Sequence, residues 1–178
     1  MKKTLLALGS AAALAAAANA DVKFTIDDMI VSGFQGNEIE TSLLSGTLTG
    51  ISFSYDYDGS QSSSSWASDA LFSWGNNVQG YSSIGGYNGT IGNWLGNWSY
   101  FGPGSAPNGT YGEAISVPAL VLNNETLFLG MFNAYSGSGP VAYSNISITL
   151  IGVNKVPAPG ALALLGAAGL AGSRRRRA

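Results

Sequence analysis

Few residues in this chain could carry out catalysis, because it contains neither histidine nor cysteine. Nucleophilic pairs of serine or cysteine with histidine are therefore excluded, as are metal sites built on histidine. The glycines fall in turn-like segments rather than in a phosphate-binding loop between a strand and a helix. The chemistry that stays open is that of a glycosidase, which needs two carboxyl groups about 5–9.5 Å apart across a cleft.

Four glutamates could supply such a pair: Glu38, Glu40, Glu113 and Glu125. Glu113 follows a glycine- and proline-rich segment, and Glu125 lies in the turn-like segment "NNET". Nothing in their spacing brings two of them together. We therefore interpret them as solvated loop carboxylates and predict that the protein is not an enzyme, with a carboxylate-pair glycosidase as an alternative.

A calcium site is a second possibility, suggested by the segment "DYDGS". Asp56 and Asp58 are two residues apart, and Asp69 follows eleven residues after Asp58. Calcium prefers several oxygen ligands from flexible loops. The segment lacks the closing glutamate of an EF-hand, so an aspartate-rich turn is the simpler interpretation and calcium at Asp56, Asp58 and Asp69 is the alternative. No other cofactor is predicted.

Four tryptophans lie within a short stretch of glycine, serine and asparagine: Trp66, Trp74, Trp94 and Trp98. Indole faces flanked by amide side chains can stack on sugar rings, so Trp66, Trp94 and Trp98 are candidate ligand-binding residues. The competing interpretation is that most of these rings fill a core, where large aromatic side chains bury much area. An exposed, coplanar aromatic pair would favour a carbohydrate-binding module.

The segments that must position these residues are predicted to be strands. "ISFSYDYDG" alternates apolar and polar residues from Ile51 to Asp58, the period of a half-buried strand, and Asp58-Gly59 signals a turn. "VKFTI" and "YSNISITLIGV" show the same alternation, whereas "ETLFLGMFNAY" is apolar on both parities and predicts a central strand covered on both faces.

Weaker strands are predicted near 70–74, 91–100 and 114–120. The best helical candidate is the short segment 37–44. Turn residues recur about every ten positions, which favours an all-β fold, a β-sandwich or jelly roll, for one domain over residues 21–154.

The first 20 residues have the layout of a secretory signal peptide. Lys2 and Lys3 precede an apolar run, and Ala18 and Ala20 form the small-x-small pattern before Asp21. The apolar run is shorter than the roughly 20 residues of a membrane-spanning helix. We therefore predict export, with cleavage after Ala20.

The last 23 residues, 156–178, form a second candidate targeting signal, at the other end of the chain from the signal peptide. It has three parts: the proline-containing segment "VPAPG" at 156–160, an apolar run at 161–172 and four arginines at 174–177. The 15 residues from Ala158 to Gly172 would span roughly 22 Å as a helix, which is short for a hydrocarbon core of about 30 Å. Arginines resist translocation. These parts predict a marginal stop-transfer element.

This tail resembles the PEP-CTERM sorting signal of Gram-negative bacteria. The motif would comprise Val156, Pro157, Ala158, Pro159 and Gly160, with Ala158 at the usual glutamate position, and the stop-transfer cluster Arg174, Arg175, Arg176 and Arg177. The resemblance implies recognition by an exosortase, a membrane cysteine transpeptidase, after transient insertion in the inner membrane. Cleavage near the motif and release to the cell surface or extracellular matrix would follow, in association with exopolysaccharide. An ordinary tail anchor is the alternative.

From Ile51 onward, a strand, the loop "SSWASDALFSW", "GGYNG" and a tryptophan-rich strand are similar in order to jelly-roll bodies of such sorted proteins. Between the predicted signal peptide and the predicted sorting signal, the body of the chain has ten carboxylates and two lysines, which give it a net charge of −8. This charge disfavours nucleic acid and anionic membrane surfaces as partners of the body. The sequence thus predicts an exported, non-catalytic surface or matrix protein, with a carbohydrate-binding module as the main alternative.

Overall fold

The computed structural model describes residues 21–62, 65–86, 91–99, 108–135 and 139–157. The predicted signal peptide, with Ala18 and Ala20, lies outside these residues. So does the predicted tail from Ala158 onward, including Pro159, Gly160 and the arginines at 174–177. Val156 and Pro157 are described.

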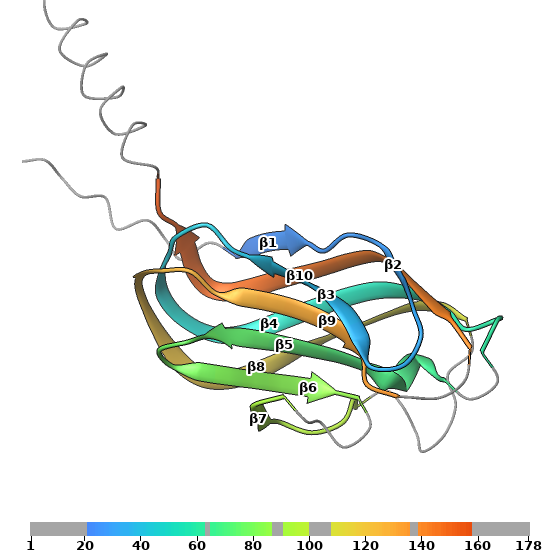
Figure 1. The fold of residues 1–178 in the computed structure, drawn as a ribbon. Coiled ribbons are helices and arrows are strands. Elements are labelled where there is room, and N and C mark those ends of the chain that lie inside the picture. Colours follow the sequence, from blue (N-terminus) through green and yellow to red (C-terminus); the bar gives the residue numbers. More distant parts are fainter. Residues whose placement is uncertain (1–20, 63–64, 87–90, 100–107, 136–138, 158–178) are drawn as a thin grey trace, which may run out of the picture.

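The described chain is all-β and forms two open, five-stranded sheets that face each other (Figure 1). The first sheet has the order β1-β10-β4-β8, with β2 also paired to β10. Its strands are β1 (Val22–Thr25), β2 (Met29–Val31), β4 (Leu44–Asp58), β8 (Gly109–Glu125) and β10 (Val141–Lys155).

The second sheet has the order β3-β9-β5-β6-β7. Its strands are β3 (Gln35–Glu40), β5 (Ala70–Asn76), β6 (Gly80–Gly85), β7 (Asn93–Trp94) and β9 (Phe128–Asn133). All pairings are antiparallel except that of β6 with β7. A single 3₁₀ turn, η1 (Ala67–Asp69), precedes β5.

The predicted alternation is confirmed in β4 and β10. Ile51, Phe53, Tyr55 and Tyr57 are buried between the sheets, whereas the serines and aspartates between them lie on the outer face. The second sheet meets this row with Phe72, whose ring centroid is 4.4 Å from that of Phe53. The core is therefore a layer of aromatic and aliphatic side chains between two sheets, as period-two patterning dictates.

The segment 37–44, the best helical candidate of the sequence, does not form a helix. Residues 35–40 form β3, which pairs with β9 along its whole length, and β4 begins at Leu44. Ile39 packs against the core, whereas Glu38 and Glu40 point outward. A helix of two turns is marginal by itself, whereas pairing with β9 gives this segment a strand partner and partly buries the Ile39 side chain.

The strand expected at 91–100 is much shorter than predicted, since in the described part of it only β7, Asn93–Trp94, is extended and paired. By contrast, β8 is longer than the predicted 114–120 and reaches from Gly109 to Glu125. Its pairing with β4 shifts register near Pro118, which lies between Ser116 and Leu120. Proline lacks an N–H and is tolerated here because β8 is the edge of its sheet.

The chain enters and leaves the domain at the same end (Figure 1). Val22 pairs with Leu150 near the end of β10, and Lys155 pairs with Leu44. We call this the tail end. The turn between β5 and β6 lies at the tail end as well, because Gln79 Nε2 donates to Glu125 Oε2 at 2.7 Å and Glu125 pairs with Leu44.

Candidate functional site

Two of the three predicted calcium ligands, Asp56 and Asp58, lie on the outer face of the first sheet near its far end. Asp56 accepts hydrogen bonds from Thr110 Oγ1 at 2.5 Å and Asn145 Nδ2 at 2.6 Å, which lower its pKa. Asp58 accepts from the Ser60 N–H and from Asn108 Nδ2, and its pKa is also lowered, chiefly by the Ser60 bond. These carboxylates link strand ends and a turn.

The third predicted ligand, Asp69, is buried in the interior at η1. Its Oδ2 accepts the Trp66 N–H at 2.7 Å and the Ser65 hydroxyl at 3.2 Å, so it closes the 3₁₀ turn. Desolvation by burial raises the pKa of Asp69. The structure does not bring the three aspartates together, and within its described ranges no three carboxylates are grouped closely enough to hold a metal ion.

Asp69 gives a prediction for the pH dependence of stability. Its raised pKa means that the folded state binds the proton more tightly than the unfolded state. That stabilisation is complete below the ordinary pKa of 3.8 and is lost as the pH rises through the folded value. Relative to Asp69→Asn, which does not titrate, the wild-type protein should therefore lose free energy of unfolding as the pH rises above the ordinary pKa of 3.8.

Urea unfolding of both proteins at each pH measures this difference. Asp56 and Asp58 have lowered pKa values and act in the opposite direction, but they are common to both proteins and cancel in the difference. Parallel profiles for wild type and variant would show that folding does not raise the pKa of Asp69.

The three candidate tryptophans separate into one core residue and two surface residues. Trp98 was a candidate ligand-binding residue, but it is not available to a ligand. Its side chain is only 3 % exposed, and its Nε1 donates to the Ala70 carbonyl at 2.8 Å. Its ring meets Phe53 and Phe72 edge-on, so it fills the core. Trp66 and Trp94 are both partly exposed. Trp66 begins the η1 turn, and Trp94 Nε1 is held by the Gly85 carbonyl at 3.1 Å.

The four glutamates are divided between two sheets. Glu113 and Glu125 lie on the edge strand β8, where Glu113 accepts hydrogen bonds from the backbone and hydroxyl of Ser99. Glu38 and Glu40 lie two residues apart on the outer face of β3, and Glu40 accepts from Thr126 Oγ1 at 2.7 Å. Glu38 and Glu40 thus stand side by side on one strand instead of facing each other across a cleft, as a glycosidase pair would.

The most distinctive surface lies on the outer face of the second sheet, along β9. Leu129 and Met131 are buried in the core, so Phe128, Gly130 and Phe132 point outward. The central strand predicted from "ETLFLGMFNAY" is confirmed as an interior strand of its sheet, but only its inner face is fully buried. Phe128 and Phe132 are half-buried on the outer face, about 13 Å apart at ~3.3 Å per residue.

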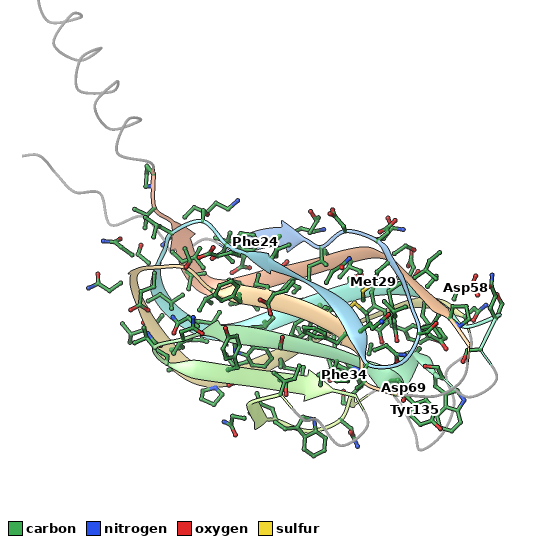
Figure 2. The ribbon with its side chains drawn as sticks, in the orientation of Figure 1. Phe24, Met29, Phe34, Asp58, Asp69 and Tyr135 are labelled. Carbon is green, nitrogen blue, oxygen red and sulfur yellow. The ribbon has the colours of Figure 1, made fainter. Side chains whose placement is uncertain are left out.

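Phe132 lies down on the sheet because its neighbours are glycines. A Cβ atom at Gly36 would come within 2.6 Å of Phe132 Cδ1, and one at Gly130 within 2.5 Å of Phe132 Cε2. Phe34, which is 48 % exposed, is nearly parallel to this ring, with an interplanar angle of 8° and centroids 6.0 Å apart. The two rings form one continuous apolar surface. Figure 2 shows Phe34 toward the end of the molecule away from the termini.

A second aromatic pair continues the surface toward the tail end. Tyr81 and Phe128 both flank Gly75 in register, and their ring centroids are 6.5 Å apart. Glu38 pairs with Gly130 and Glu40 with Phe128, so both carboxylates border the rings on one side. We call this set of four side chains the aromatic strip: Phe34, Phe132, Phe128 and Tyr81.

The aromatic strip was not predicted as a site. Its members come from β6, from β9 and from the turn before β3, and strand pairing alone makes them neighbours. The signal available in the sequence was the two-sided apolar pattern of β9, whose outward phenylalanines had no predicted partner.

No family model matches the chain, and no curated protein sequence matches it. In the part of the chain that the structure describes, no helix has the length and apolar character of a membrane span.

Proposed function

We propose that this protein is an exported, non-catalytic surface module that binds polysaccharide through the aromatic strip. The observation that supports this proposal is the nearly parallel pair of Phe34, which is 48 % exposed, and Phe132, which is half-buried on the outer face of β9, with the Glu38 carboxylate opposite the neighbouring Gly130. Aromatic faces pack on the apolar faces of sugar rings, and carboxylate oxygens accept hydrogen bonds from hydroxyls. A flat strip of this kind suits an extended glycan chain.

The negative charge of the domain restricts the class of glycan that it can bind. The domain carries ten carboxylates and two lysines, and Glu38 and Glu40 lie beside the strip. An acidic polysaccharide would be repelled by this field, whereas a neutral or amino-bearing one would not. We therefore assign neutral or amino-sugar exopolysaccharide as the ligand class.

We infer a jelly roll as the finer fold assignment. Leaving aside the short β7 and taking β1 and β2 as one interrupted strand, the sheets read β1/β2-β10-β4-β8 and β3-β9-β5-β6. Strands that follow one another in the chain belong to different sheets, except for the hairpin of β5 and β6, and this is the strand order of a jelly roll. This assignment agrees with the resemblance of the body to jelly-roll domains of sorted proteins.

We propose the route to the cell surface from the signal peptide and the C-terminal sorting signal. The signal peptide directs export, with Asp21 as the mature N-terminus, and the tail is inserted transiently before an exosortase-type enzyme cuts it. One structural observation supports a motif at this position: β10 ends at Lys155, the Val156 N–H still donates to the Leu43 carbonyl at 2.8 Å, and Pro157 is exposed. The motif therefore begins where the sheet ends.

Glycan-array binding of the exported protein tests the proposal. We expect Phe34→Ala to weaken binding about tenfold, which corresponds to about 1.4 kcal/mol, because half of the parallel pair is removed. Val121→Ala, an exposed apolar position on β8, is the matched control and should bind like wild type. Equal binding by Phe34→Ala and wild type, or no binding to any neutral or amino-sugar glycan, would contradict the assignment of the strip.

A further inference from the structure

The tail end of the domain exposes apolar side chains around the point where the chain leaves. Leu43, whose carbonyl holds Val156, is 43 % exposed. Val78, at the tip of the turn between β5 and β6, is 85 % exposed, and Val121 on β8 is 67 % exposed. The Gln79 side chain connects the last two, since its Nε2 contacts both the Val121 carbonyl and Glu125. We call Leu43, Val78 and Val121 the tail-end apolar set.

The length of chain between this end and the apolar run is short. Val156 is hydrogen-bonded to Leu43, so the free tether before the apolar run comprises only the four residues from Pro157 to Gly160. Four residues reach at most about 14 Å when fully extended. The polar headgroup layer on each side of a bilayer is about 5–8 Å thick. A domain whose tail is inserted is therefore held with its tail end at or within the headgroup layer.

The charges at this end are mixed. Of the two lysines of the domain, Lys155 lies at this end, where β10 ends, and its Nζ packs 5.0 Å above the Phe24 ring. Lys23 pairs with Thr149, six residues before Lys155, and lies farther along the sheet. The carboxylates of Glu40 and Glu125 are nearby, and they accept hydrogen bonds from Thr126 and Gln79. The lysines are the only basic groups of a domain that is otherwise acidic.

We propose that the tail-end apolar set docks on the lipid surface while the tail is inserted, so that the precursor stands upright on the membrane. The proposal rests on the insertion of the tail proposed above. Exposed valine and leucine side chains partition into the boundary between headgroups and acyl chains. In this orientation the aromatic strip runs along the side of the domain, and Phe34 is at the end farther from the membrane.

The absence of cysteine from the chain provides a clean test. Full-length Val78→Cys and Gln61→Cys, each carrying one environment-sensitive fluorophore, are reconstituted in vesicles of phosphatidylethanolamine and phosphatidylglycerol that contain a nitroxide-labelled lipid. Gln61 is exposed beyond the far end of β4. We expect severalfold stronger quenching at position 78 than at position 61. Val121→Cys, on a strand rather than a turn, is a second reporter with the same expectation.

Two further variants distinguish docking of the tail-end apolar set on the lipid surface from proximity that the inserted tail alone imposes. A flexible glycine-serine spacer after Pro157 should leave quenching at position 78 intact if the apolar set holds the surface. Leu43→Asp combined with Val121→Asp in the spacer variant should abolish it. Loss of quenching with the spacer alone, or equal quenching at positions 78 and 61, overturns the docking proposal while insertion stands. A chain that fails to float with the vesicles overturns both proposals.

Discussion

Phe53→Ala is expected to lower the free energy of unfolding by about 3–5 kcal/mol, a large share of the roughly 5–15 kcal/mol that stabilises an ordinary domain. Phe53 is 2 % exposed and lies at the centre of the aromatic core. Its ring centroid is 4.4 Å from that of Phe72 in the facing sheet, 5.7 Å from Trp98 and 6.2 Å from Trp74. Truncation would leave a cavity that rings fixed on two sheets cannot close.

Phe34→Ala is the matched control, because it removes the same atoms from the outer face. Phe34 is half exposed, so its truncation should change the free energy of unfolding by no more than about 1 kcal/mol. Urea unfolding followed by tryptophan fluorescence measures both variants, since Trp74 and Trp98 lie beside the cavity. If Phe34→Ala destabilises the protein as much as Phe53→Ala, the distinction between core rings and strip rings is wrong.

The sequence alone was sufficient for the strands that alternate. β4, β10 and β1 each place one apolar face toward one core, and the period of two is visible without knowledge of the partner strand. The same rule could not identify residues 37–44, which are the best helical candidate of the sequence. There the apolar residue Ile39 stands alone between two glutamates, and only pairing with β9 identifies the segment as a strand.

The candidate site could not be predicted because its parts are assembled by register. Phe34 and Phe132 are far apart in the chain and meet because Gly36 pairs with Phe132 across β3 and β9. Trp98 was predicted as a ligand residue, but its ring and its N–H both find partners inside the core. A tryptophan surrounded by small polar residues in sequence can thus be surrounded by aromatic rings in space.

The aspartates illustrate the same limit. Asp56 and Asp58 belong to the outward parity of β4, which the alternation predicted. Asp69 belongs to a turn that folds inward, where burial and the Trp66 N–H determine its role. The spacing of the three aspartates along the chain did not show that Asp56 and Asp58 lie on the surface whereas Asp69 is buried. Because of this difference in burial, the three carboxylates cannot share one metal ion.

The tail variants carry the other large expected effect. Replacing Arg174–Arg177 with serine should release uncut protein to the periplasm, in a host that carries an exosortase. The apolar run is marginal for a span, so the arginines must supply retention, at about 2.5–3.5 kcal/mol for each arginine at the centre of a membrane. Immunoblotting of membrane and periplasmic fractions, with mass spectrometry of the C-terminus, distinguishes cut from uncut chains.

Replacing residues 157–160 with a glycine-serine segment of equal length should have the opposite result and leave the protein in the inner membrane. This change keeps Val156 and its hydrogen bond to Leu43, so the fold and the tether length are unaltered and only the motif is lost. The variant with serines at 174–177 is the control for this motif variant. Both keep the folded domain, but one loses membrane retention and the other loses the cleavage motif. A wild-type protein that keeps its C-terminus in the same host would identify the tail as a permanent anchor. In that case the domain would remain at the membrane, and any polysaccharide bound by the aromatic strip would be held there with it.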